Sequence, residues 1–343
     1  MALYLSLLIF SFIITSILIV PFINLLYKFR VLRRKQVTKD FQGKQTKIFD
    51  KFHGHKVGTP MGGGLLVILV VAFLYAILFP LISYLGVFIS SAHSINEELN
   101  ILFFSFISFG ILGLYDDLRK LFGFKQTGFF GLRMRHKLVI QLLLALVIGM
   151  LLYWNLGIDF FHIPFLGTFR IGWWYVPLSA LIIVSFTNAF NITDGLDGLS
   201  SGLLTICLFA FWLLANSVLD TPLSIFLALW IGSLIAFLYF NVYPARIWLG
   251  DVGALAFGAT LAVVGLLIGK VMALVVMGGI FVVEVGSSLL QIFWKKFFHK
   301  KLFAVAPLHL WLQNKGWEEP KIVMRAWLAG LILAIFGMWM AVI

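Results

Sequence analysis

The chain has 343 residues, of which 62% are hydrophobic and only 12% are charged, and its formal net charge is +12. A soluble domain of this size carries about a quarter charged residues, so the composition excludes an ordinary soluble protein and predicts a chain that crosses a membrane several times. The single cysteine, Cys207, excludes an intrachain disulfide.

Apolar runs long enough to cross about 30 Å of hydrocarbon recur along the whole chain. We expect ten transmembrane helices in a single all-α membrane domain over residues 1–343, with both termini on the same side. The expected spans, in chain order, are residues 3–27, 61–82, 99–115, 137–154, 174–190, 200–217, 222–241, 252–269, 271–294 and 323–343.

The basic residues indicate the orientation of these spans. Of the 26 Lys and Arg residues, 24 fall on one side of the expected bundle, and only Arg170 and Lys270 fall on the other. An excess of Lys and Arg marks the cytoplasmic side of a membrane protein. We therefore expect both termini to be extracytoplasmic.

Three aspartate motifs lie on the predicted cytoplasmic side: Asp116 with Asp117, Asp194 with Asp197, and Asp251. Carboxylates near a bilayer are costly and usually mark a function. Glycine, asparagine and lysine accompany these aspartates in compact patterns, whereas the acidic residues of the expected outer loops have no such motif. Five carboxylates at span ends indicate a divalent cation, and a cation there indicates phosphate chemistry at the cytoplasmic face.

The middle motif suits Mg²⁺. Asp194 and Asp197 are three residues apart and would share a face if this segment were helical. Asn188 and Asn191 lie just upstream and add amide groups, and Mg²⁺ takes hard oxygen ligands while keeping waters and substrate phosphates. For Asp251, the alternative to facing a metal is a role as a helix N-cap.

The first motif predicts different roles for its two aspartates. Asp116 and Asp117 are adjacent, so on a helix they point about 100° apart, and one could act as a base or metal ligand while the other orients a neighbour. Lys120, Lys125 and Lys137 follow within one loop. The general excess of basic residues on the cytoplasmic side explains most of these lysines, although some could neutralise phosphate oxygens.

Two further features have competing interpretations. His53 and His55 could form a two-histidine metal site, but solvated loop histidines are the favoured interpretation. Glu284, within an expected span, is a functional candidate by position or a hydrogen-bonded structural residue.

The motifs together resemble those of the polyprenyl-phosphate N-acetylhexosamine-1-phosphate transferases. The matching segments are Asp-Asp-x-x-Lys at 116–120, Asn-x-Thr-Asp-Gly-Leu-Asp-Gly at 191–198, and Asn241 followed by Pro244-Ala245 and Gly250-Asp251. Lys-x-Gly-Thr-Pro at 56–60 and Lys-Gly-Trp-Glu-Glu-Pro-Lys at 315–321 are similar to the branch that uses a muramoyl-pentapeptide substrate. The resemblance covers nearly the whole chain.

This resemblance implies a Mg²⁺-dependent phospho-sugar transferase of peptidoglycan synthesis. It would transfer phospho-MurNAc-pentapeptide from UDP-MurNAc-pentapeptide to undecaprenyl phosphate, giving lipid I and UMP. It also implies a multi-pass protein of the bacterial cytoplasmic (inner) membrane that forms a homodimer. The bilayer supports this expectation independently, because a lipid phosphate and a soluble nucleotide can meet at the cytoplasmic ends of helices.

The resemblance also implies roles for individual residues. Asp251 would be the principal Mg²⁺ ligand, Asp116 the base beside Asp117, and Asp194 would line the diphosphate and sugar region. Asp197, with the backbone near Gly195 and Leu196, would recognise uracil. The remaining substrate contacts would come from Lys56, Asn188, Asn191 and Asn241, from Trp248 stacked on uracil, from Lys125 and Lys137 at phosphates, and from His309.

Where the family usually carries three consecutive histidines, this chain has His309-Leu310-Trp311. The nearest alternative is therefore a related transferase that uses UDP-GlcNAc. A more distant alternative is a secondary transporter in which Glu284 is the essential acid.

Overall fold

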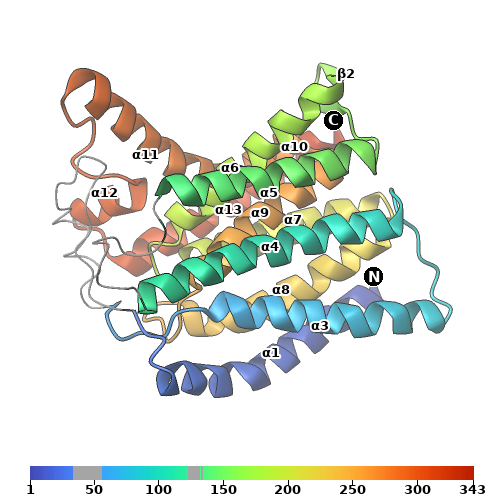
Figure 1. Ribbon diagram of the computed structural model, residues 1–343, viewed down its shortest axis with the longest axis horizontal. Coiled ribbons are helices and arrows are strands. Elements are labelled where there is room, and N and C mark those ends of the chain that lie inside the picture. The colour runs from blue at the N-terminus through green and yellow to red at the C-terminus, as the bar shows by residue number, and fades with distance from the viewer. Residues whose placement is uncertain (34–55, 123–131, 133) are drawn as a thin grey trace.

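Long apolar helices make up most of the computed structural model, which describes residues 1–33, 56–122, 132 and 134–343 (Figure 1). The helices are α1 (Ala2–Lys28), α3 (Gly63–Tyr84), α4 (Ile95–Phe122), α5 (Met134–Trp154), η2 (Gly172–Trp174), α6 (Tyr175–Thr193), α7 (Leu199–Ser217), α8 (Thr221–Asn241), α9 (Gly250–Leu267), α10 (Val271–Met277), α11 (Gly279–Phe298), α12 (Leu308–Asn314) and α13 (Glu319–Val342). Within these described ranges, nine helices could each cross a membrane, and the bent pair α10 and α11 would make a tenth.

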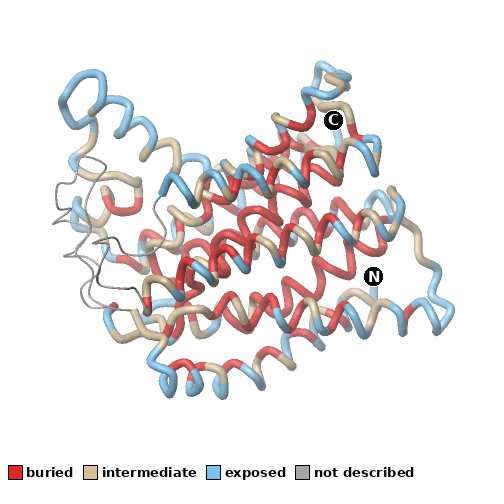
Figure 2. Tube along the Cα trace, viewed as in Figure 1, coloured by how far each residue is buried: buried red, intermediate tan, exposed pale blue. Residues whose placement is uncertain are grey.

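The centre of the bundle is formed by α8 and α9. Every residue of α9 except Asp251 is buried, and Figure 2 shows the buried residues concentrated along the middle helices. Small residues let neighbouring helices come close to α9. A Cβ at Gly113 of α4 would overlap the backbone of Asp251, and one at Gly64 of α3 would overlap Gly253. These contacts fix the start of α9 against α3 and α4.

The two termini lie at the same end of the bundle, as expected for an even number of spans (Figure 1). At the opposite end α4, α6 and α8 finish while α3, α5, α7, α9 and α13 begin. All three aspartate motifs therefore meet at one end of the bundle.

Two of the predicted spans differ from the observed helices. The span expected at 99–115 is observed as the longer helix α4. Acidic residues in its first turn and basic residues in its last turn stabilise the two helix ends, so the helix extends beyond the apolar residues. Asp116 and Asp117 thus lie inside a helix.

The span expected at 271–294 is broken at Gly278 into α10 and α11, and the chain bends by 77° there. A side chain at Gly278 would contact Phe186, so glycine permits the tight bend against α6.

The all-α bundle also contains one small β element that was not predicted. Strands β1 (Phe160–Ile163) and β2 (Gly167–Arg170) form an antiparallel hairpin in which Phe160 pairs with Arg170. Aromatic and β-branched residues favour strands, and Gly167 adopts a φ of 97° at the turn. The hairpin lies at the end of the bundle that carries the termini (Figure 1).

Candidate active site

Two lysines and two aspartates from three helices form a compact cluster at the start of α9. The Lys120 Nζ lies 2.8 Å from Asp251 Oδ2 and 3.3 Å from Asp116 Oδ2. The Lys137 Nζ lies 3.1 Å from Asp116 Oδ2 and also forms an ion pair with Asp251. The first and third aspartate motifs therefore converge, although 134 residues separate Asp117 from Asp251.

Asp117 has a different position from its neighbour Asp116. Its Oδ2 accepts a hydrogen bond of 3.0 Å from the backbone amide of Val252, so it caps the first turn of α9. The alternative role of Asp251 as an N-cap is wrong, because Leu249 is the N-cap residue and the Asp251 carboxylate faces the two lysines. The two aspartates thus have different partners, as predicted, while the role of one of them as base or metal ligand stays a prediction.

A second buried ionic cluster joins Lys56, Asp197 and Glu319. The Lys56 Nζ lies 2.9 Å from Asp197 Oδ1 and 2.5 Å from Glu319 Oε1. Glu319 Oε1 also accepts a hydrogen bond from the Asp197 backbone amide, and Asp197 Oδ2 accepts one from the amide of Ala245. Buried charges persist only when they are paired in this way, so this cluster fixes the loop after α6.

Trp248 adjoins the second cluster. The Lys56 Nζ lies 4.7 Å and the Arg33 Cζ 4.6 Å from the centroid of its ring, within the range of cation–π attraction. The Trp248 carbonyl accepts hydrogen bonds from the amides of Gly62 and Gly63, which ties the ring to the start of α3. Burial lowers the pKa of Arg33 from its ordinary value, while three nearby carboxylates act against that shift.

A cavity of about 370 Å³ extends from Lys120 and Asp251 of the first cluster to Trp248, which adjoins the second cluster. Its lining includes Lys120, Asn191, Asp194, Trp248, Asp251 and His309. Burial raises the pKa of Asp194 to about 6, although Ser200 donates a hydrogen bond of 2.5 Å to its carboxylate. The cavity thus joins carboxylates, an amide, an imidazole and a lysine from helices that are distant in sequence.

The middle motif is not helical, so Asp194 and Asp197 do not share a helix face. The helix α6 ends at Thr193 and α7 begins at Leu199. The intervening turn directs Asp194 to the cavity and Asp197 to Lys56.

His309 is held by Glu284. Its Nδ1 lies 3.0 Å from Glu284 Oε2, and its backbone amide donates to the same carboxylate. Both residues are buried, and His309 lines the cavity close to Gly195, where a Cβ would overlap the imidazole. Glu284 therefore orients the histidine of the site.

Other predicted site residues lie away from the cavity or outside the described residues. Asn188 Nδ2 donates to Gln141 Oε1 at 2.8 Å, between α6 and α5. Asn241 is bonded to Ser201 and to the Ile247 carbonyl, and Leu196 is buried in the core. Three residues lie outside the described residues: Lys125, His53 and His55.

The carboxylates of the first cluster are compatible with a metal ion that takes most of its ligands from the substrate and from water. Across residues 1–33, 56–122, 132 and 134–343, no three His, Cys, Asp or Glu side chains group as a metal-binding cluster. Within the described part of the chain, however, Asp117 Oδ1 is buried near Asp251 without a hydrogen-bond partner, although the Lys120 Nζ lies 3.8 Å from it. Mg²⁺ is usually bound through one or two carboxylates plus substrate phosphates and water, so Asp251 with Asp117 or Asp116 fits it.

The residues Lys120, Glu319, Arg33 and Ser200 belong to the site but were not among the predicted site residues. Lys120 closes the Asp-Asp-x-x-Lys motif, where the general excess of cytoplasmic lysines was an equally good explanation. Glu319 lies within the Lys-Gly-Trp-Glu-Glu-Pro-Lys motif, which was recognised only as a family signal. Arg33 stands among many basic residues of one loop, and Ser200 has no charge or motif of its own. Only the fold shows that Glu319 reaches Lys56 and that Ser200 reaches Asp194.

The chain is similar to known proteins over most of its length. Residues 99–269 match the family model described as glycosyl transferase family 4. The chain is 37% identical over 282 residues to a protein of Caldanaerobacter subterraneus subsp. tengcongensis named phospho-N-acetylmuramoyl-pentapeptide-transferase, covering 82% of this chain and 84% of that one. Proteins of the same name from Bacillus subtilis (34% identity, 85% of this chain and 86% of the other) and Pelagibacter ubique (34%, 82% and 80%) are also similar.

Proposed function

We propose, on the premise that the chain belongs to the phospho-N-acetylmuramoyl-pentapeptide transferase family, that it makes lipid I. It transfers phospho-MurNAc-pentapeptide from UDP-MurNAc-pentapeptide to undecaprenyl phosphate and releases UMP. The observation that carries this proposal is the single cavity that joins Asp251 and Lys120 to Asp194, Trp248 and His309 at one end of the helix bundle.

The cluster of Asp116, Lys120, Lys137 and Asp251 suits the reacting phosphates. The two ammonium groups can shift from the aspartates to phosphate oxygens and offset the charge of the diphosphate. Asp116 is placed to accept any proton left on the lipid phosphate, although that group is already largely ionised near pH 7. A phosphate oxygen of the acceptor then attacks the diphosphate phosphorus that bears the sugar, and the bond to UMP breaks. Positioning and electrostatics supply most of the catalysis in such transfers.

Mg²⁺ is part of this proposal. Asp251, with Asp117 or Asp116, would hold the ion beside the substrate diphosphate. When bound, it would supply charge stabilisation for the leaving UMP.

The second ionic cluster suits the nucleoside end of the substrate. Lys56, Asp197 and the backbone beside them offer donors and acceptors to a uracil ring, and Trp248 offers an aromatic surface next to the cavity. His309, oriented by Glu284, reaches the sugar region between the two ends.

The setting of the enzyme is proposed from the same considerations. The long apolar helices fit a multi-pass bacterial membrane protein, and the distribution of basic residues supports an active site on the cytoplasmic face of the inner membrane. In that orientation, both termini are extracytoplasmic. The family resemblance favours a homodimer.

The test is a comparison of two sugar nucleotides with the purified full-length chain. Undecaprenyl phosphate and Mg²⁺ are supplied with UDP-MurNAc-pentapeptide or with UDP-GlcNAc, and UMP release is measured. We expect release only with the muramoyl-pentapeptide substrate. Release only with UDP-GlcNAc would assign the chain to the related transferases, and release with neither would contradict the enzyme assignment.

A further inference from the structure

Arg33 lies on a short extended segment that follows α1 and pairs with the chain ahead of α3. The Arg33 amide donates a hydrogen bond of 2.9 Å to the Thr59 carbonyl, and the Arg33 carbonyl accepts one of 3.0 Å from the Gly58 amide. The Trp248 amide donates to the carbonyl of Pro60, in the same segment as Thr59, at 2.8 Å. These backbone hydrogen bonds fix Arg33 and Trp248 relative to each other.

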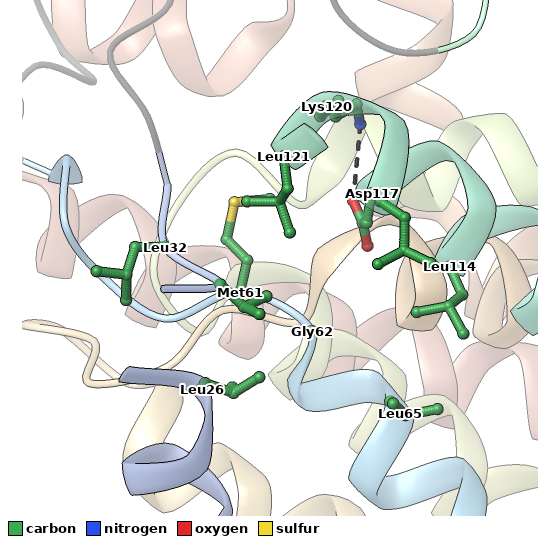
Figure 3. A pocket seen from close by; sticks show the side chains of 11 residues that line it. Leu26, Leu32, Met61, Gly62, Leu65, Leu114, Asp117, Lys120 and Leu121 are labelled. Atoms are coloured by element: carbon green, nitrogen blue, oxygen red, sulfur yellow. Dashed lines mark ion pairs between the residues drawn. The ribbon is translucent and has the colours of Figure 1, made fainter. Parts of the chain in front are cut away.

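Neighbouring side chains of this extended segment point to different sides. Leu32 lines an apolar pocket between α1, α3 and α4 (Figure 3). Arg33 instead lines the catalytic cavity, together with Trp248, Asp194 and Asp251. Successive side chains of an extended chain alternate in direction, so one short segment can serve both spaces. The guanidinium of Arg33 therefore belongs to the cavity.

Arg33 and Lys120 are the Lys and Arg side chains that line this cavity in the described part of the chain. Lys120 is already paired: its Nζ lies 2.8 Å from Asp251 Oδ2, and Figure 3 shows it directed towards Asp117. Among the described residues, no carboxylate lies within ion-pair distance of the Arg33 guanidinium, and none accepts a hydrogen bond from it. Its contact is with the Trp248 ring, whose centroid lies 4.6 Å from Arg33 Cζ.

A partly buried arginine without an ion pair attracts an anion. Burial lowers the pKa of Arg33, and the carboxylates of Asp194, Asp197 and Glu319 oppose that shift only from a distance. A charge held away from water is stabilised by a paired counter-charge, which an incoming anion would supply. The contact with the ring uses none of the five N–H donors of the guanidinium, and their planar arrangement matches phosphate oxygens.

We propose that Arg33 binds the uridine-side phosphate of the sugar nucleotide, the phosphate that leaves in UMP. This inference rests on the proposed function and adds a substrate-binding residue to it. With uracil against Trp248, one ribose separates the base from this phosphate, and Arg33 contacts the same ring. The phosphate that bears the sugar would then lie further along the cavity, at Asp251 and Lys120. The guanidinium would offset the charge that grows on UMP as the bond breaks.

The first test compares UMP with uridine as ligands of the purified full-length chain, without added Mg²⁺ so that no metal holds the phosphate. We expect the wild type to bind UMP more tightly than uridine. In Arg33→Gln, UMP binding should weaken about tenfold while uridine binding stays unchanged, since only UMP carries the phosphate. Arg30→Gln is the matched control, because Arg30 is exposed and three residues away.

Three outcomes of this comparison would overturn the inference. The first is equal affinity of the wild type for UMP and uridine, which needs no variant to observe. The second is unchanged UMP binding in Arg33→Gln. The third is equal weakening of UMP and uridine in that variant, which would show that Arg33 only supports the Trp248 ring. Retained uridine binding also shows that the variant is folded.

The second test uses a conservative variant and steady-state kinetics. Arg33→Lys keeps the charge but loses the planar arrangement of donors, so it should recover part of the UMP affinity lost in Arg33→Gln. We expect Arg33→Gln to raise the KM for UDP-MurNAc-pentapeptide about tenfold and to leave the KM for undecaprenyl phosphate unchanged. A change confined to the acceptor would assign Arg33 to the lipid phosphate and overturn the inference.

The two proposals fail in different ways. Absence of UMP release from the wild-type chain would contradict the proposed function, and the comparison of UMP with uridine would still decide whether Arg33 binds a nucleotide phosphate. UMP release by the wild type, with equal UMP affinity in the wild type and Arg33→Gln, would leave the function standing and remove the role of Arg33.

Discussion

The carboxylate of Asp117 accepts a hydrogen bond from the backbone amide of Val252, 3.0 Å away, and so caps the helix whose first turn carries Asp251. Its neighbour Asp116 instead shares Lys120 and Lys137 with Asp251. One aspartate therefore positions the helix and the other belongs to the charged cluster. The position of the proposed metal ligand depends on both.

Removing the acceptor at position 117 should destabilise the start of α9. We expect Asp117→Ala to lower the unfolding free energy by about 1 kcal/mol, the usual cost of losing a helix cap. Asp117→Asn keeps a carbonyl oxygen that can accept from Val252, so its thermal midpoint should stay close to that of the wild type. Measurement of both midpoints in detergent checks this, and equal losses in the two variants would refute the capping role.

Glu319 should act on nucleotide binding rather than on the acceptor. It contacts Lys56 and the Asp197 amide, so Glu319→Gln removes one of the two carboxylates that hold the Lys56 ammonium. We expect the KM for UDP-MurNAc-pentapeptide to rise about tenfold, with little change in the KM for undecaprenyl phosphate. Glu318→Gln is the matched control, because Glu318 is exposed. A similar effect in both variants, or a change confined to the acceptor, would contradict this role.

The raised pKa of Asp194 predicts an acid limb in the activity profile. Burial raises this pKa from 3.8 to about 6, so the folded enzyme takes up a proton at Asp194 as the pH falls through about 6. Protonation of Asp194 favours the folded state, because the pKa of this carboxyl group is higher in the folded than in the unfolded chain. The folding stability that Asp194 contributes is therefore lost as the pH rises through about 6, whereas activity needs the ionised form. We expect activity to decline below about pH 6.

Ser200 tests the assignment of that limb. Its hydrogen bond favours the ionised form of Asp194, so Ser200→Ala should move the inflection to higher pH. Ser217→Ala, at the other end of α7, should leave the inflection in place. An unchanged inflection in Ser200→Ala would show that another group controls the acid limb.

The packing of α4 on α9 should tolerate no added methyl group at Gly113. A Cβ there would overlap the Asp251 backbone, and overpacking of this kind typically costs about 1–3 kcal/mol. Gly286→Ala is the control, because a Cβ at Gly286 would meet no atom of the described residues within 4 Å. We expect Gly113→Ala to have a lower thermal midpoint and lower activity than Gly286→Ala. Equal midpoints would contradict the close contact.

The sequence was sufficient to predict most of the helices, because each span needs a long apolar run and the runs are separated by polar segments. It could not predict where α4 ends, since charged residues continue a helix that hydropathy alone would stop at residue 115. The bend between α10 and α11 was also not predictable. It depends on the contact between Gly278 and Phe186, which are distant in sequence.

The aspartates of the three motifs were predicted as site residues from the sequence, because carboxylates stand out among apolar helices. Their partners were harder to identify. Glu318 and Glu319 are adjacent and chemically identical, yet only Glu319 is buried against Lys56. Similarly, the N-cap role of Asp251 was an alternative that only the fold could exclude, because Leu249 is the N-cap residue and Asp251 faces Lys120 and Lys137.

The most direct test of the account is transfer of labelled phospho-MurNAc-pentapeptide to undecaprenyl phosphate by the wild-type chain, Asp251→Asn and Asp159→Asn. Asp159 lies beside the hairpin at the opposite end of the bundle, so its variant serves as the control. We predict lipid I formation by the wild type and Asp159→Asn, and a loss of at least about 100-fold in Asp251→Asn, as expected when a charged group that acts in the transition state is removed. Equal activity of the two variants, with lipid I formed, would contradict the assignment of the active site to the Asp251 cavity.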